Sequence, residues 1–148
     1  MKDSLSEGLT FESTFQVPDH WTVPHLFRES EEFQRMPQVL ATGFMVGLIE
    51  WACIKAINPH IDWPEEQTVG IRVDLSHSAA TPPGMTVTIR GRLQKVEGRH
   101  LTFSIMASDD VDTISEGIHE RFVIDAPKFK AKAASKGQQT AAAATNDK

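Results

Sequence analysis

The feature that most constrains the fold of this chain is a long apolar segment that contains one charged residue. Between Arg35 and Lys55 the single charge is Glu50, within the run ATGFMVGLIEWAC at positions 41–53. Burying a carboxylate costs free energy unless hydrogen bonds or an opposite charge compensate it. A helix that keeps such a group indicates a chemical use for it. The alternative is a structural acid that an arginine or the backbone satisfies.

The apolar segment predicts one buried helix from about Thr42 to about Ile57. Thr42 is suited to be its N-cap, because a hydroxyl there can accept from a free backbone N–H at the positive end of the helix dipole. Gly43 and Gly47 are poor helix formers that share one helix face, which indicates close packing of a backbone or a ligand there. The pair Asn58–Pro59 ends the helix.

Alternating apolar and polar residues predict five strands, one before the helix and four after it. A turn at Glu97–Gly98 predicts a hairpin between two of them, and Gly117 predicts a bulge or a close backbone approach. This element order is α+β, and the antiparallel sheet can wrap around the one long central helix so that both share one core. The predicted strands are Thr10–Val17, Val69–Ser76, Thr86–Val96, Leu101–Met106 and Thr113–Ile124.

With 148 residues, the chain is long enough for one domain with a substantial core. We assign this domain to residues 1–132. The tail, residues 133–148, continues a segment rich in Lys, Ala, Gln and Thr that lacks Leu, Ile and Val. We expect helix in the first part of this segment and disorder from about Ser135 onward.

Composition excludes several classes of function. The net charge of -5 disfavours nucleic acid as a partner. Cys53 is the one cysteine, so no internal disulfide forms, and a reducing compartment such as the cytoplasm is expected. The N-terminus has no apolar signal core, and Pro37 and Glu50 make a buried soluble helix a better interpretation than a membrane span. Five histidines show no metal-ligand spacing with nearby acids or Cys53, so we expect no metal and no cofactor; they are His20, His25, His60, His100 and His119.

A second chemical group follows the strand predicted at Val69–Ser76. His77 can carry a proton near neutral pH, and we interpret Thr42, Glu50 and His77 as one catalytic constellation. Taken singly, each has a simpler explanation: Thr42 as a helix cap, His77 as a hydrogen-bonded histidine at a strand end, and Glu50 as a structural acid. Arg90, Arg92, Lys95 and Arg99 are explained most simply as a solvated strand face, with contact to the phosphate groups of a ligand as the alternative.

The sequence resembles the hotdog-fold thioesterases, and within them the fluoroacetyl-CoA thioesterase family. The similarity extends from the N-terminus to about Lys132. Two long stretches carry it, ATGFMVGLIEWAC at 41–53 and HSAATPPG at 77–84; VEGR at 96–99 and HER at 119–121 add to it. The resemblance implies an acyl-CoA thioesterase that acts on a short-chain, possibly fluoroacetyl, thioester, with coenzyme A as part of the substrate. It also implies a homodimer with its active sites at the subunit interface.

The resemblance further implies roles for individual residues. Thr42, Glu50 and His77 are expected to be catalytic, Gly70 to offer its backbone N–H near the acyl group, and Arg121 to lie near the acyl end. Gly70 as a simple bulge and Arg121 as the partner of a surface acid are the alternatives.

A hydrophobic lid over the acyl pocket is also implied. Phe33 matches a lid position, and Val23 and Leu26 match its neighbours. Met36 stands where the family pattern has a second phenylalanine. Methionine is flexible and fills space adaptably, so this departure predicts a looser pocket and weakens the expectation of fluoroacetyl selectivity.

Several reaction routes are compatible with these residues. Glu50 can attack the thioester carbonyl to form an anhydride or act as the base for water, and we favour Glu50 in one of these roles. Thr42 can donate a hydrogen bond or be a nucleophile activated by His77. Removal of an acidic α-proton by His77, followed by loss of the thiolate, is a third route. The competing functions are a hotdog hydratase or dehydratase, whose Asp/His signature is not found, and a non-catalytic acyl-CoA-binding module.

Overall fold

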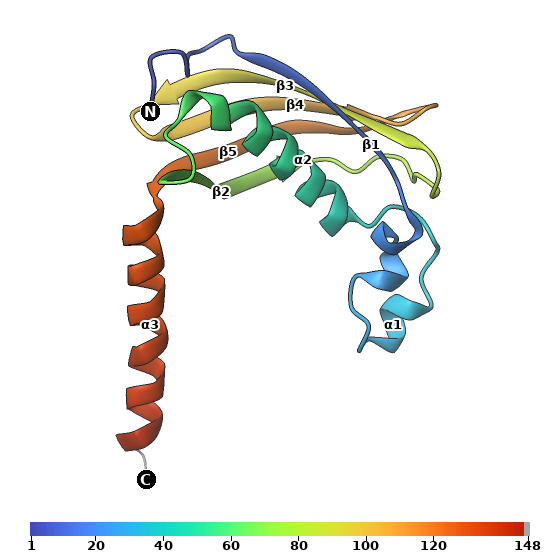
Figure 1. Cartoon of the computed structure of the whole chain (residues 1–148). Coiled ribbons are helices and arrows are strands. Elements are labelled where there is room, and N and C mark those ends of the chain that lie inside the picture. The colour runs from blue at the N-terminus through green and yellow to red at the C-terminus, as the bar shows by residue number, and fades with distance from the viewer. Residues whose placement is uncertain (147–148) are drawn as a thin grey trace.

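The computed structural model describes residues 1–146, in which helix α2 (Thr42–Ile57) lies against one face of a curved antiparallel sheet (Figure 1). The five strands follow the order β1-β3-β4-β5-β2. The predicted α+β arrangement is therefore confirmed, and the predicted bounds of α2 agree with the structure at both ends. The strands are β1 Thr10–Gln16, β2 Glu66–Leu75, β3 Thr86–Glu97, β4 His100–Ser108 and β5 Thr113–Asp125.

The core lies between α2 and the sheet. On β3, Val87, Ile89 and Leu93 are fully buried, whereas Arg90 and Arg92 point to the exposed face. This alternation follows from the period of two along a strand. Full burial of such aliphatic side chains contributes about 1.5–3 kcal/mol each, so this face fixes the register of the sheet. Helix α2 contributes Met45, Leu48, Ile49, Ala52, Cys53 and Ile57 to the same core.

The capping of α2 differs from the prediction, although the helix begins at the predicted residue. The N-cap is Ala41, which makes no side-chain cap, and Thr42 is the first helical residue. The predicted capping role of Thr42 is therefore wrong. Its hydroxyl instead contacts His77, as described below. The predicted end of α2 is confirmed, since Asn58–His60 forms a single 3-10 turn (η3) that contains Pro59.

One face of α2 is left open by the single chain. Gly43, Gly47 and Trp51 recur every four residues along this face and are all exposed. A Cβ atom added at Gly47 would meet no atom within 4 Å among the described residues. The sheet of one chain therefore covers only one side of a helix that is apolar on nearly every side.

Strand β2 forms one edge of the sheet, with β5 as its neighbour. Ile71 and Val73 are 49% and 50% exposed on this edge strand. The register shifts between Gly70 and Arg72, so the bulge considered for Gly70 is present. Gly117 on β5 has φ +148 and lies directly against the carbonyl of Asp74, which confirms the close approach predicted there.

Short helical turns precede α2 along the chain. They are η1 (Asp19–Trp21), η2 (Val23–His25) and α1 (Glu31–Gln34), which lie beyond the N-terminal end of α2 (Figure 1). Ser30 caps α1 by accepting a hydrogen bond from the backbone N–H of Phe33 at 3.2 Å.

The C-terminal segment forms helix α3 (Ala126–Asn146), which projects away from the sheet (Figure 1). The helix extends past the boundary predicted at Ser135, because its many alanines are the best helix formers even without a core to pack on. Side chains 127–145 are all exposed. The last two residues of the predicted disordered tail lie outside the described residues, and the division at residue 132 stays a prediction. No helix within residues 1–146 is long and apolar enough to cross a membrane.

Candidate active site

The start of α2 and the segment after β2 bring a hydroxyl and an imidazole together. Thr42 Oγ1 lies 2.7 Å from His77 Nδ1. The other ring nitrogen, His77 Nε2, is buried and has no hydrogen-bond partner among residues 1–146. Burial lowers the pKa of His77 below its usual range. The imidazole is therefore neutral near pH 7 and able to accept a proton.

A small hollow of about 260 Å³ adjoins this pair. Its walls are mainly apolar, and Thr42 and His77 supply the polar groups able to act on a ligand there. Pockets for drug-sized ligands are typically about 300–1,000 Å³, so this hollow suits a small group. The lining residues are Val23, Val39, Leu40, Thr42, His77, Ser78, Ala79 and Ala80.

Two turns further along α2, Glu50 faces Arg121 of β5. Arg121 Nη1 donates to Glu50 Oε1 at 3.2 Å. The Arg121 side chain is 2% exposed, but that of Glu50 is 39% exposed. The expectation of a deeply buried carboxylate is therefore wrong for the single chain, because the open face of α2 leaves one side of Glu50 uncovered. Arg121 is itself buried and pairs with this partly exposed acid, and its place near the acyl end stays a prediction.

Arg121 is held by a buried network. Its Nε donates to Thr68 Oγ1 at 2.9 Å, and its Nη2 donates to the Thr68 carbonyl at 2.8 Å. Nη1 also lies 3.1 Å from His119 Nε2, and His119 Nδ1 lies 2.9 Å from the carbonyl of Arg72. Burial lowers the pKa of Arg121 from its ordinary value, yet guanidinium groups remain charged in proteins.

Gly70 lies directly against the Glu50 carboxylate. A Cβ atom at position 70 would overlap Glu50 Oε1 and lie 3.2 Å from His119 Cε1. The absence of a side chain at Gly70 thus lets the carboxylate approach the backbone of β2. A side chain at this position would displace the Glu50 carboxylate from its observed place.

Within one chain the three predicted catalytic residues form two separate groups. Thr42 contacts His77, and Glu50 contacts Arg121. Thr42 and Glu50 stand eight positions apart on α2, which is about 12 Å along the axis at a rise of 1.5 Å per residue. The structure of the single chain therefore does not bring Glu50 and His77 together.

The residues predicted for the lid lie in the turns that precede α2. Val23 lines the small hollow, and Leu26 lies over Gly43, where a Cβ atom would be 3.4 Å from its side chain. Phe33 packs edge-on against Phe27 with ring centroids 5.2 Å apart. Met36 is 51% exposed. Val23 and Leu26 thus sit beside the site, and Phe33 and Met36 belong to the more exposed part of the same segment.

His119 is the residue whose role the sequence interpretation missed, since it was considered as a metal ligand and as part of the HER stretch at 119–121 but not as a partner of Arg121. The alternation along β5 places it on the same face as Arg121, and that signal identifies it as part of the buried network. Among residues 1–146, no group of three or more His, Cys, Asp or Glu could hold a metal ion. Cys53 is buried, and burial raises the pKa of its thiol to about 12, which makes it a core residue rather than a nucleophile.

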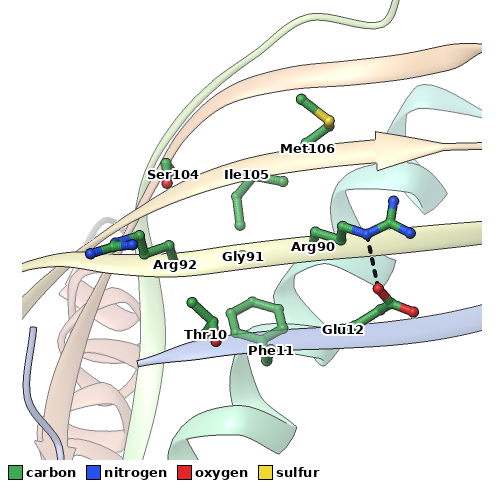
Figure 2. A pocket seen from close by; sticks show the side chains of 9 residues that line it. All are labelled: Thr10, Phe11, Glu12, Arg90, Gly91, Arg92, Ser104, Ile105 and Met106. Atoms are coloured by element: carbon green, nitrogen blue, oxygen red, sulfur yellow. Dashed lines mark hydrogen bonds and ion pairs between the residues drawn. The ribbon is translucent and has the colours of Figure 1, made fainter. Parts of the chain in front are cut away.

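A second hollow lies away from these groups, on the outer face of the sheet (Figure 2). It has a volume of about 680 Å³ and is lined by three consecutive residues from each of β1, β3 and β4. Arg90 Nε donates to Glu12 Oε2 across it at 2.8 Å (Figure 2). This pairing agrees with the simpler interpretation of these arginines as a solvated strand face.

Comparison with known proteins identifies relatives over most of the chain. The profile of the family described as fluoroacetyl-CoA-specific thioesterase matches residues 24–127. The fluoroacetyl-CoA thioesterase of Streptantibioticus cattleyicolor is 51% identical over 132 residues, which cover 89% of this chain and 94% of that protein.

Solved structures agree with this relationship. The structure of the fluoroacetyl-CoA thioesterase FlK has a TM-score of 0.87 at 49% identity, covering 90% of this chain and 98% of that one. A mutant of the same enzyme in complex with fluoroacetate and CoA has a TM-score of 0.82 at 50% identity, covering 84% and 99%. A thioesterase superfamily member from Thermus thermophilus has a TM-score of 0.81 at 27% identity, covering 93% and 97%. The chain belongs to the fluoroacetyl-CoA thioesterase family and is a thioester hydrolase with the hotdog fold.

Proposed function

We propose that this protein hydrolyses the thioester of a short-chain acyl-CoA, at a site that Thr42 and His77 of one subunit form with Glu50 of a second subunit. The observation that carries the proposal is the 2.7 Å contact between Thr42 and a neutral His77 at the wall of a small apolar hollow. A relative at 51% identity carries the name fluoroacetyl-CoA thioesterase, which supports an acyl-CoA substrate.

Assembly into a homodimer through the β2 edge supports this arrangement. Strand β2 presents unpaired backbone groups and the exposed apolar residues Ile71 and Val73, a combination that favours pairing with a second strand. If two copies pair antiparallel about a two-fold axis, the end of β2 nearest His77 in one copy lies beside the beginning of β2 in the other. The open face of α2 that carries Gly47, Glu50 and Trp51 then gains a cover, and Glu50 of one copy can approach His77 of the other.

The chemistry follows from the charge of each group. Glu50 is a carboxylate held in an ion pair, so it can attack the thioester carbonyl or remove a proton from water. His77 is neutral and can accept a proton from Thr42 or from water, or protonate the leaving thiolate afterwards. Backbone N–H groups at the start of α2 and at Gly70 are the donors available to a developing oxyanion.

The small volume of the hollow, and the predicted lid residues Val23 and Leu26 beside it, argue for a short acyl group. A fluoroacetyl group is one such group, and its α-protons are acidic enough to allow the alternative route of α-proton removal by His77. Met36 replaces a rigid aromatic ring with a flexible side chain, so the proposal is a short-chain thioesterase without strict preference for the fluorinated substrate. We further propose that the enzyme needs no metal or cofactor and acts in the cytoplasm, where a free Cys53 stays reduced.

A panel of thioesters tests the proposal. Purified protein is mixed with fluoroacetyl-, acetyl-, butyryl- and octanoyl-CoA, and released thiol is measured with a chromogenic disulfide. We expect the fastest release from the two-carbon substrates. Absence of release from every substrate, together with measurable binding of acyl-CoA, would instead establish a binding module.

Subunit complementation tests the shared site. E50Q and H77A are prepared as inactive variants and mixed after reversible dissociation. If the site is shared, each mixed dimer holds one intact site, so activity returns to about a quarter of the wild-type value at equal mixing. If the site lies within one subunit, both sites of every mixed dimer lack a residue and no activity returns.

A further inference from the structure

We propose that His119 is a positioning residue for the thioesterase site: its neutral imidazole, protonated on Nδ1, fixes Arg121 and, through Arg121, the carboxylate of Glu50. This inference rests on the proposed role of Glu50. It concerns a residue that touches no substrate and lies on β5, beneath the bulge of β2.

The hydrogen-bond partners of His119 define its protonation state. The side chain is 0% exposed, and both ring nitrogens are engaged by groups of fixed polarity. The Arg72 carbonyl can only accept, so Nδ1 at 2.9 Å must carry the proton and donate it. The Arg121 guanidinium can only donate, so Nε2 at 3.1 Å must present its lone pair. These two contacts are compatible with one neutral tautomer and with no charged form.

Four of the five N–H groups of Arg121 are engaged in this arrangement. Nε and one N–H of Nη2 go to Thr68, and the two N–H groups of Nη1 are directed at His119 and Glu50. A guanidinium is planar, so three anchors determine where its fourth contact points. His119 is the anchor on the same nitrogen that holds Glu50. Loss of its lone pair would remove the contact that holds the Nη1 edge, and the whole planar group would be free to tilt about its two bonds to Thr68 and move Nη1 out of line with the carboxylate.

The bulge in β2 connects this network to the backbone beside the site. The register shift between Gly70 and Arg72 turns the Arg72 carbonyl toward His119, while Gly70 lies against both Glu50 and His119. His119 therefore joins the strand that offers the Gly70 backbone to the arginine that orients the acid. One imidazole sets the relative position of two parts of the proposed active site.

The charged and titratable groups around His119 keep its ring neutral. Arg121 flanks it on β5, Glu50 acts on it from α2, and Glu120 follows it on β5. Burial, and then the positive charge of Arg121, lower the pKa of His119 against the opposing effects of the Arg72 carbonyl and the two carboxylates. Protonation of Nε2 would place a new donor against the guanidinium and remove the contact.

Substitutions that replace one nitrogen at a time test the role. H119Q can present an amide oxygen near the position of Nε2, H119N can donate near the position of Nδ1 but cannot reach Arg121, and H119L removes both contacts. We expect H119Q to keep at least about a third of the wild-type kcat, and H119N and H119L to lose about tenfold or more with KM changed less than about threefold. H100N, at a half-exposed histidine of β4 that meets Glu120 from the other face, is the control and should keep wild-type kcat.

Two further measurements separate positioning from simple stability. H119L should change the residual kcat of E50Q, measured at high enzyme concentration, much less than it changes the kcat of wild type, because a positioning residue acts through the group that it positions. Nitrogen-15 NMR of the histidine rings should show His119 protonated on Nδ1 alone at pH 7. The proposal is overturned if H119Q and H119L lose equal activity, if the effects of H119L and E50Q are additive, or if Nε2 carries a proton. Failure of all thioesters to react would refute the proposed function instead. The NMR measurement does not depend on activity, so it tests the protonation of His119 in either case.

Discussion

The hydroxyl of Thr42 lies 2.7 Å from Nδ1 of His77, while the second ring nitrogen of His77 is buried without a partner among the described residues. A buried nitrogen with no partner is costly in a finished structure. Thr42 engages Nδ1, and we propose that Nε2 is the nitrogen through which His77 exchanges a proton with substrate or water.

H77A is expected to lower kcat about a hundredfold or more, because it removes the group that carries the proton in each proposed route. The wild-type pH profile of kcat/KM should rise with pH through an apparent pKa below 6.5. The sign follows from the neutral imidazole as the active form and from the burial that lowers its pKa. A rate that falls with rising pH over this range, or near-wild-type turnover by H77A, would remove His77 from the mechanism.

G70A is expected to lower kcat by about tenfold or more, because the added methyl group overlaps Glu50 Oε1 and forces the carboxylate away from β2. G137A on α3 is the matched control, since a Cβ atom there meets no described atom within 4 Å. The two variants are compared by steady-state kinetics and by thermal unfolding. Equal kcat in G70A and G137A would show that Glu50 does not need its place against the strand.

M36F is expected to raise the ratio of kcat/KM for fluoroacetyl-CoA to that for acetyl-CoA, because a rigid ring fills space that methionine covers loosely. The corresponding control is V111F, which adds a ring at an exposed position of the turn between β4 and β5. Both ratios are measured in competition assays with the two thioesters. An unchanged ratio in M36F would count against a lid role for Met36.

The helix and the strands were predictable from the sequence because their patterns are local. The bounds of α2 follow from the apolar run and from Asn58–Pro59, and the strands follow from alternation. The capping role assigned to Thr42 failed because a hydroxyl at a helix start can serve either the backbone or a distant side chain. Here the hydroxyl contacts His77, which lies 35 positions further along the chain.

The network around Arg121 could not be predicted from local sequence patterns. Glu50 and Arg121 are separated by 71 positions, and Arg121 and Thr68 by 53. Their contact depends on β5 pairing with β2 beneath α2, which no spacing in the sequence encodes. The partial exposure of Glu50 has a similar origin, because the face that we expect to cover it belongs to a second copy of the chain.

The stability of the fold should decrease as pH falls below about 6.5, the ordinary pKa of histidine. Burial lowers the pKa of His119 in the folded state, so the unfolded chain binds more protons in this range and unfolding is favoured. The stabilisation is therefore complete above the unfolded pKa and is lost as pH falls toward the folded pKa. Urea unfolding is measured at several pH values between 5 and 8, and the free energy of unfolding should change less with pH for H119Q than for wild type. An identical pH dependence would mean that His119 is protonated equally in the folded and unfolded states.

I71K combined with V73K is expected to convert the protein to a monomer, because two like charges on the β2 edge oppose the pairing of two such edges. Sedimentation velocity measures the change in mass, and the monomer should lose nearly all thioesterase activity, since neither chain alone brings Glu50 to His77. M106K on the outer face of the sheet is the control, and it should stay dimeric and active. A wild-type protein that is monomeric and fully active would exclude the shared site. An active monomeric variant would do the same.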